Sequence, residues 1–238
     1  MQRRSSLADC DYVMANSPQF DPTLPSNLLL VTSEILIGNR KWSVTAAPSQ
    51  DAILSASAEF EHFPFGLLLW ESAIGLGEYF CNHPEFLAGK RVLELGAGVG
   101  VSGIVARSLG AEVWQTDHQK NALQLSQFNA YQNQIIGIQT FLADWRHWNH
   151  SRKYDFVIGA DITYGREMHF YLEQIFRQSL LPGGKLILAD PGRPQSFEFA
   201  ARLEKTGWKL EMETVSVPRI EANETSPRVD IEIWIGGE

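Results

Sequence analysis

Three glycines at alternating positions follow a short apolar run, and an acidic residue precedes them. Residues 92–103 read VLELGAGVGVSG. Counted from Glu94 the pattern is Glu-x-Gly-x-Gly-x-Gly, with glycines at Gly96, Gly98 and Gly100; counted from Gly98 it is Gly-x-Gly-x-x-Gly, the dinucleotide fingerprint. Without a Cβ atom the backbone turns sharply and approaches a ligand closely. Both frames predict a binding turn, but for different ligands.

Acidic residues end three successive strands that we expect in this part of the chain. They are Glu94, Asp117 and Asp144. Asp117 fits both ligands, because a carboxylate at this position accepts hydrogen bonds from the ribose of either cofactor. The pyrophosphate of a dinucleotide repels carboxylates, whereas S-adenosylmethionine carries a sulfonium and an ammonium group and no phosphate. Glu94 and Asp144 therefore favour S-adenosylmethionine.

Short strands and helices alternate from Lys90 onward. Val/Ile/Leu-rich strands separated by helical stretches are typical of a parallel sheet with helices on both faces, so we expect a doubly wound, Rossmann-like α/β fold. Ligands bind beyond the carboxyl ends of the strands in this fold, where the glycine turn and the acids lie. We expect strands at 91–95, 111–117, 136–144, 154–162 and 184–190, and helices from about Val101 and over 120–131, 167–180 and 197–205.

The C-terminal pattern differs from the rest of the domain. Alternating strands at 208–217 and 229–236 are joined by a loop of about ten residues without a crossover helix, so they should pair antiparallel. They complete a seven-stranded, mostly parallel sheet.

A small β-hairpin is expected near the N-terminus. Gly38 and Asn39 tolerate the positive φ that a two-residue turn needs, and strand-like residues flank them. Apolar residues recur at helical intervals over 65–80, which predicts a helix leading into the main domain. We divide the chain into a flexible tail (1–26), a hairpin with a linker (27–61) and a main domain (62–238).

Composition narrows the function classes. The 238-residue chain has a net charge of -8, which argues against nucleic acid as a partner, because phosphate backbones are bound by clustered Lys and Arg. Cys10 and Cys81 lack metal-ligand spacing and the six histidines form no HxxxH or HExxH motif, so we expect no metal. No apolar run reaches the ~18 residues that span a bilayer. We expect a soluble, cytoplasmic protein that does not bind membranes.

Over roughly residues 62–236, the sequence resembles the seven-strand class I S-adenosylmethionine-dependent methyltransferases. The resemblance rests on VLELGAGVG, on the acid Asp117 at the end of the next strand and on the antiparallel C-terminal hairpin. It implies a Rossmann-like fold and S-adenosylmethionine as the cofactor.

The same resemblance assigns the cofactor contacts. It implies that Glu94 and the glycine turn lie beside the amino-acid moiety and Asp117 beside the ribose. Asp144 and Trp145 would lie beside the adenine, and we include Ala160 among the cofactor-binding residues. From the residues alone, Glu94 as a cap of backbone N–H groups, Asp144 as a turn residue and Trp145 as a packing residue stay open.

The acceptor side of the site is expected in the segment ADITYGRE, residues 160–167. Methyl transfer requires the nucleophile's lone pair to be held about 3 Å from the methyl group. Methyltransferases that act on adenine or amide nitrogens resemble one another in an Asn-Pro-Pro-Tyr-type loop here. This chain has Asp161 in place of that Asn, which favours a cationic or strongly basic amine. We therefore expect Asp161 and Tyr164 to be catalytic; Asp161 as a helix cap and Tyr164 as a packing residue are the alternatives.

Three segments resemble the protein-lysine branch of the superfamily, methyltransferase family 16. They are Asp-x-x-Tyr, Asp-Trp and PFGLLLWES, and the last of them, with ADPGR, is similar to bacterial relatives of the electron-transfer-flavoprotein β-subunit lysine methyltransferase. The resemblance implies that Trp70 borders the cofactor. This chain lacks the Pro that many relatives have shortly after that Trp. Asp190 and Arg193 either line the acceptor mouth or form a turn.

The leading hypothesis is an S-adenosylmethionine-dependent N-methyltransferase that acts on a lysine side chain of a protein substrate. A small-molecule amine or another nucleophile is the alternative acceptor. A nicotinamide-dependent dehydrogenase and a non-catalytic cofactor-binding module are the alternatives from other classes. The sequence leaves the acceptor's identity, the number of methyl groups added and the oligomeric state open.

Overall fold

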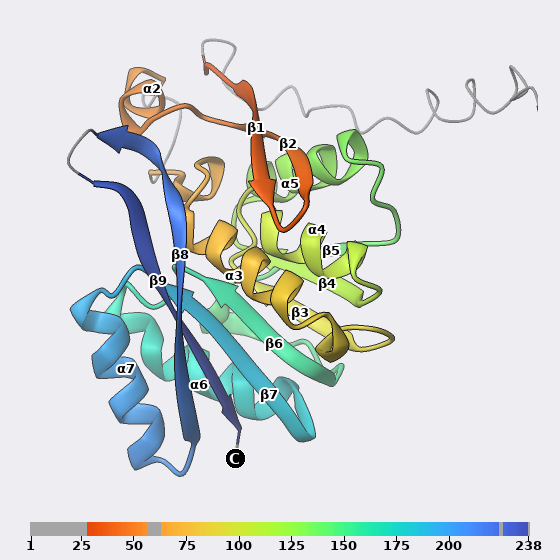
Figure 1. The fold of residues 1–238 in the computed structure, drawn as a ribbon. Coiled ribbons are helices and arrows are strands. Elements are labelled where there is room, and N and C mark those ends of the chain that lie inside the picture. The colour runs from red at the N-terminus through yellow and green to blue at the C-terminus, as the bar shows by residue number, and fades with distance from the viewer. Residues whose placement is uncertain (1–27, 57–62, 224–225, 238) are drawn as a thin grey trace, which may run out of the picture.

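A seven-stranded sheet forms the centre of the computed structural model, which describes residues 28–56, 63–223 and 226–237. Its strand order is β5-β4-β3-β6-β7-β9-β8 (Figure 1). Residues 1–27, which include the expected tail, and residues 57–62, which include the end of the expected linker, lie outside the described residues. The strands are β3 (Arg91–Leu95), β4 (Glu112–Asp117), β5 (Gln139–Leu142), β6 (Tyr154–Ala160), β7 (Leu180–Asp190), β8 (Lys209–Asn223) and β9 (Ser226–Gly237).

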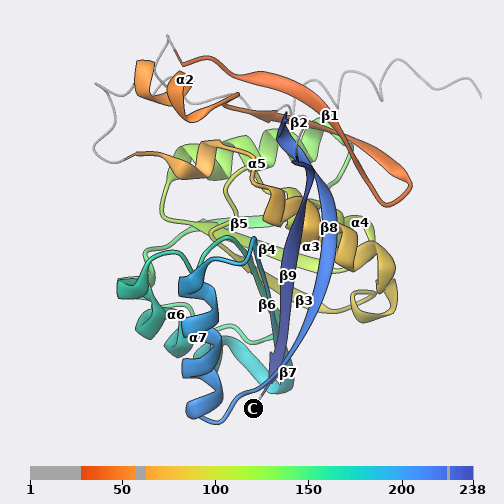
Figure 2. The same cartoon turned by 60° about the vertical axis from the view of Figure 1, so that its left-hand side comes forward.

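Helices cover both faces of this sheet, as Figure 2 shows. Consecutive residues of a strand point to opposite faces, so Val92 packs against one group of helices and Leu93 against the other. Burial on both faces explains why β6 and the second half of β7 are almost continuously apolar. One group is α3 (Glu71–Asn82), α4 (Val101–Ser108) and α5 (Lys120–Gln132); the other is α6 (His169–Ser179) and α7 (Pro194–Lys205). The predicted doubly wound fold is confirmed.

Strands β8 and β9 form the predicted antiparallel hairpin, and β9 pairs antiparallel with β7. The expected loop of about ten residues is wrong, because the strands continue to Asn223 and start again at Ser226. Pro218 suggested a loop, but β8 lies at the sheet edge, where a residue without an N–H group is tolerated.

The helix expected over 65–80 begins only at Glu71. Phe65–Leu67 form a short 3-10 helix, η2, and Leu68 is extended. The reason is a tertiary contact: the carbonyl oxygen of Leu67 accepts a hydrogen bond from the Ala47 N–H at 2.8 Å, and Leu68 makes an isolated bridge to Ala47. The backbone between the two helical pieces is thus held by another part of the chain.

The predicted N-terminal hairpin is confirmed as β1 (Val31–Ile37) and β2 (Arg40–Ala46), with Gly38 at φ 58° in its turn. It packs over α5 rather than joining the main sheet. Asn129 of α5 accepts a hydrogen bond from the Thr45 N–H and donates to the carbonyl oxygens of Thr45 and Val99. The hairpin is therefore tied to the glycine turn. A short helix, α2 (Gln50–Ser55), follows it.

None of the helices in the described ranges is both long and apolar enough to cross a bilayer.

Candidate active site

The glycine turn connects β3 to α4. Gly98 and Gly100 have φ values of 53° and 86°, in the left-handed region that favours glycine. A Cβ atom on Gly100 would lie 2.1 Å from Ser126 Oγ, so no larger residue fits. At Gly96, a Cβ atom would lie 2.9 Å from Ile162 Cγ2 and 3.3 Å from Trp145 Cζ2. The ends of β3, β5 and β6 thus meet at this turn.

Asp117 at the end of β4 holds the turn in place. Because β3 and β4 are adjacent parallel strands, their carboxyl ends lie side by side. One carboxylate oxygen accepts from the Gly98 N–H at 3.0 Å, and the other from the Gln119 N–H at 2.9 Å. His118 Nδ1 lies 3.3 Å from the carboxylate, and this hydrogen bond raises the pKa of His118.

Glu94 lies beneath the turn, with 2% of the residue exposed. Its Oε2 atom accepts from the Gly103 N–H at 3.1 Å and from Gln115 Nε2 at 2.7 Å. Burial raises the pKa of Glu94 to about 7, although these hydrogen bonds oppose the shift. These contacts favour the capping alternative for Glu94. A direct contact with the cofactor stays a prediction.

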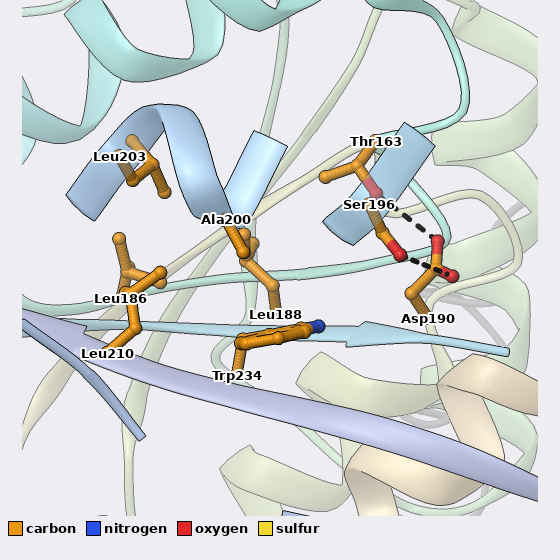
Figure 3. A pocket seen from close by; sticks show the side chains of 9 residues that line it. All are labelled: Thr163, Leu186, Leu188, Asp190, Ser196, Ala200, Leu203, Leu210 and Trp234. Atoms are coloured by element: carbon orange, nitrogen blue, oxygen red, sulfur yellow. Dashed lines mark hydrogen bonds between the residues drawn. The ribbon is translucent and has the colours of Figure 1, made fainter. Parts of the chain in front are cut away.

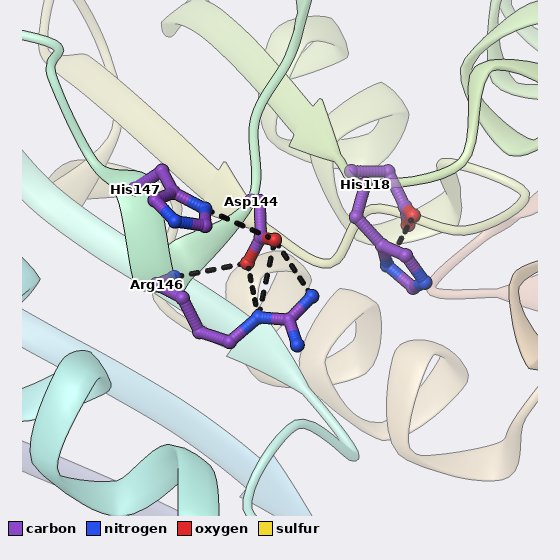
Figure 4. A network of polar contacts seen from close by, with 5 residues as sticks. His118, Asp144, Arg146 and His147 are labelled. Carbon is purple, nitrogen blue, oxygen red and sulfur yellow. Dashed lines mark hydrogen bonds and ion pairs between the residues drawn. The ribbon is translucent and has the colours of Figure 1, made fainter.

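Asp144 and Trp145 lie where β5 ends. Asp144 caps the short 3-10 helix η4 (Trp145–His147) and accepts three side-chain hydrogen bonds from Arg146, with Arg146 Nη2 at 2.7 Å (Figure 4). The hydrogen bonds from Arg146 hold the pKa of Asp144 well below its usual range. Asp144 is therefore a turn residue, as the alternative states. Trp145 lies against the glycine turn.

The segment η2 lies over the glycine turn. The Gly66 carbonyl oxygen is 3.3 Å from the position of a Cβ atom on Gly98, and a Cβ atom on Gly66 would lie 3.5 Å from an Asp117 oxygen. Trp70 Nε1 donates to the Phe65 carbonyl oxygen at 3.1 Å, which fixes the indole beside this segment. Sequence reasoning included Trp70 but missed Phe65 and Gly66; the small Gly66 next to an aromatic residue was the available signal.

Asp161 follows the last residue of β6, Ala160, which pairs with Ala189 in β7. Asp161 has a φ of 54°, an unusual conformation for a residue other than glycine, and its N–H donates to the Ala189 carbonyl oxygen at 2.8 Å. Such conformations cluster at functional sites. The capping alternative is wrong, because Asp161 caps no helix and its carboxylate pairs with Arg193.

Tyr164 is 51% exposed at the end of the same segment. Its ring centroid lies 6.1 Å from that of Phe65, which is also exposed. Burial and the nearby carboxylates of Asp117 and Asp161 raise the pKa of the Tyr164 hydroxyl. The pair joins the acceptor segment to η2, and a role of Tyr164 beyond packing stays a prediction.

Asp190 organises the loop after β7. Its oxygens accept from Ser196 Oγ at 2.9 Å and Thr163 Oγ1 at 3.2 Å, as Figure 3 shows, and from the Arg193 N–H at 2.6 Å. The Arg193 backbone therefore forms a turn with Asp190, as one of the two alternatives from the sequence states. The Arg193 side chain extends to the Asp161 carboxylate. Thr163 and Ser196 were not anticipated from the sequence, because single hydroxyl residues carry no distinctive spacing.

The chain has clear similarities to known proteins. Residues 49–205 match a family model described as Lysine methyltransferase. The chain is 30% identical over 171 residues to "Protein-lysine N-methyltransferase EFM3" of Chaetomium thermophilum, covering 64% of this chain and 51% of that protein. It is 26% identical over 169 residues to "Histone-arginine methyltransferase METTL23" of Mus musculus, covering 66% and 67%.

Two further comparisons bear on the expected resemblance. The chain is 27% identical over 139 residues to the electron transfer flavoprotein beta subunit lysine methyltransferase of Rattus norvegicus, covering 56% of this chain and 52% of that protein. The precorrin-6y C5,15-methyltransferase structure from Geobacter metallireducens superposes with a TM-score of 0.55 at 14% identity, covering 68% and 88%, which shows the shared fold. The match spans about half the length of several of these curated relatives.

Proposed function

Because the chain belongs to the lysine methyltransferase family, we propose that it is an S-adenosylmethionine-dependent N-methyltransferase whose acceptor is a lysine side chain of a protein. One observation carries the proposal. A buried carboxylate, Asp161, is held in a strained backbone conformation near the exposed Tyr164, directly after β6, the strand that pairs with β3. A carboxylate that can bind an ammonium group, next to the proposed cofactor site, supports the proposal.

The third glycine of the dinucleotide frame has a structural role that involves no dinucleotide. The third glycine of the dinucleotide frame, Gly103, donates its N–H to the buried Glu94 carboxylate, and a Cβ atom on Gly103 would lie 2.3 Å from Glu94 Oε2. Gly103 is thus required by an internal contact. A pyrophosphate at the start of α4 would meet this carboxylate, which argues against the dehydrogenase alternative.

The residues at the turn fit S-adenosylmethionine. The Asp117 carboxylate at the turn keeps lone pairs free for ribose hydroxyls, because each carboxylate oxygen accepts more than one hydrogen bond. We assign Gly100 to the turn itself, and Trp70, Asp144, Trp145 and Ala160 to its border. When bound, S-adenosylmethionine supplies an electrophilic methyl group on a positively charged sulfur.

The acceptor residues bind and orient the amine. The Asp161 carboxylate attracts the arriving ammonium and, after its deprotonation, accepts a hydrogen bond from the neutral amine so that the lone pair is aligned. The exposed rings of Tyr164 and Phe65 provide a surface for the alkyl chain of the acceptor. We propose the cytoplasm as the location, because Cys10 and Cys81 show no disulfide spacing.

The test combines binding and transfer. Calorimetry should detect S-adenosylmethionine and its demethylated product but not NAD. Radiolabelled methyl donor, incubated with the enzyme and a cell extract, should label protein, and acid hydrolysis should release methyl-lysine. Label in methyl-arginine or in the small-molecule fraction would reject the lysine acceptor, and tight NAD binding without S-adenosylmethionine binding would reject the methyltransferase assignment.

A further inference from the structure

We propose that Arg193 is an exchangeable counter-cation of Asp161, so that an acceptor reaches the Asp161 carboxylate only by displacing the Arg193 guanidinium. Arg193 would thereby select acceptors that carry a positive charge. This inference rests on the proposed function and adds to it the residue that sets acceptor specificity.

The ion pair occupies both oxygens of Asp161. Arg193 Nε lies 2.8 Å from one oxygen and Arg193 Nη2 lies 2.7 Å from the other, which is the bidentate geometry that guanidinium groups form with carboxylates. The Asp161 side chain is 7% exposed, whereas that of Arg193 is 38% exposed. The guanidinium therefore covers the carboxylate on the side that faces solvent.

The two partners differ in mobility. Asp161 is fixed by its N–H bond to Ala189 and has a short side chain. The Arg193 backbone is equally fixed, because its N–H donates to Asp190 and its carbonyl oxygen accepts from Ser196 Oγ at 2.7 Å. Only the long Arg193 side chain is left to rotate. The guanidinium can leave Asp161 without any rearrangement of the loop.

The charges around Arg193 favour replacement by another cation. The carboxylates of Asp161, Asp190 and Glu71 all act on the guanidinium and raise the pKa of Arg193. Departure of the guanidinium alone would leave a buried carboxylate without a partner, which is costly. An arriving ammonium compensates this cost, and a neutral amine does not.

The neighbouring aromatic residues fit the rest of such an acceptor. Tyr164 lies three residues after Asp161, and its ring contacts that of Phe65, which in turn lies 6.3 Å from the ring of Trp70. Aromatic faces attract cations and accommodate alkyl chains. A side chain with an alkyl stem and a terminal cation matches this combination.

The exchange is tested by binding of small cations, which needs no catalysis. Chemical-shift titration with n-butylammonium should show binding about tenfold tighter to Arg193→Ala than to the unaltered protein, because the competing cation is gone. Adding Asp161→Asn to Arg193→Ala should abolish this gain. Arg193→Lys, which retains a cation, should bind like the unaltered protein. Equal affinity of the unaltered protein and Arg193→Ala, or a gain that survives Asp161→Asn, would overturn the proposal.

Two additions make the result decisive. Arg193→Gln retains a polar side chain of similar reach, and it should give a gain of the same sign even if Arg193→Ala does not fold. Arg166→Ala is the matched control, because it breaks another bidentate pair, with Glu198, that makes no contact with Asp161. Cation binding by this control should be unchanged; an equal gain there would mean that general surface charge, not Asp161, is responsible.

Methyl transfer then separates this inference from the proposed function. With a lysine peptide, Arg193→Ala should lower KM by a larger factor than any change in kcat. A fall in kcat that Arg193→Lys restores would mean that Arg193 positions Asp161 and is not displaced, which overturns the exchange. If the unaltered enzyme transfers no methyl group, the proposed function fails, and the butylammonium titration alone decides the exchange.

Discussion

The glycine turn and the Asp161 segment lie on adjacent strands, β3 and β6, and they use carboxylates in different ways. Glu94 and Asp117 accept hydrogen bonds from backbone N–H groups, one of them that of Gly98 in the turn. Asp161 instead pairs with the side chain of Arg193, which comes from a loop 32 residues later in the chain.

This difference separates a fixed region from an exchangeable one. Backbone N–H groups cannot leave without unfolding the turn, so Glu94 and Asp117 shape the proposed cofactor site. A guanidinium on a long side chain can leave, so Asp161 is available to a second cation. The chain thus places a rigid binding surface next to a carboxylate whose partner can be replaced.

Substitution of Gly98 by Arg should have the largest effect on the fixed region. The new side chain would require a left-handed conformation and lie against the Gly66 carbonyl oxygen. We expect calorimetry to show S-adenosylmethionine affinity reduced roughly 100-fold, or about 2.8 kcal/mol. Gly89→Arg is the control, since Gly89 has a φ of 70° with no atom within 4 Å of an added Cβ. Equal affinities of the two variants would remove the turn from the proposed site.

Glu94→Gln should change how stability depends on pH. Since burial raises the Glu94 pKa to about 7, the folded state binds its proton more tightly than the unfolded state. The Glu94 contribution to the free energy of unfolding is complete below the ordinary pKa of about 4.3 and declines as pH rises toward 7, by at most about 1.4 kcal/mol per pH unit.

Urea unfolding between pH 5 and pH 7 measures this decline. It should disappear in Glu94→Gln and persist in Glu112→Gln, a control at the exposed start of β4. If the free energy of unfolding depended on pH in the same way in Glu94→Gln and the unaltered protein, Glu94 would not be the group whose raised pKa causes the decline.

In the exchangeable region, Tyr164→Ala removes the ring contact with Phe65. Such contacts contribute about 0.5–1.5 kcal/mol, so KM for a lysine peptide should rise by up to about tenfold, with S-adenosylmethionine affinity unchanged. Phe170→Ala, at another exposed aromatic residue, is the control and should leave KM as it is. A loss of cofactor affinity in Tyr164→Ala would assign Tyr164 to the fixed region instead.

Arg146→Ala should have the smallest effect, although it also breaks a bidentate pair. The pair with Asp144 lies at the surface, where ion pairs contribute about 0–1 kcal/mol, so urea unfolding should show a change within that range. If the free energy of unfolding fell by more than about 2 kcal/mol, a solvent-exposed ion pair would be structural, and the exposure of a guanidinium would not identify an exchangeable pair.

The sequence predicted the fold well because its signals are local. Apolar strands, the glycine turn and the Gly38-Asn39 hairpin each follow from a few consecutive residues. The start of α3 at Glu71 was not predictable in the same way, because it depends on the contact between Leu67 and Ala47. The length of β8 was not predicted, because Pro218 would end a central strand but is tolerated in an edge strand, and the sequence does not show which of the two β8 is.

The site residues, too, were predictable only as far as local sequence signals reach. Residue types and strand ends placed the expected site residues along one edge of the sheet. They did not reveal the direction of each side chain, such as the burial of Glu94 beneath the turn. The pairing of Asp161 with Arg193 joins residues 32 positions apart, and no sequence pattern connects them.

Asp161→Ala tests the central claim most directly, when single-turnover methyl transfer and S-adenosylmethionine affinity are measured on the same variant. The account predicts unchanged affinity and transfer that is slower by roughly 100-fold, because the acceptor amine loses its alignment. Unchanged transfer, or a loss of cofactor affinity as large as the loss of rate, would contradict the division between a fixed cofactor region and an exchangeable acceptor carboxylate.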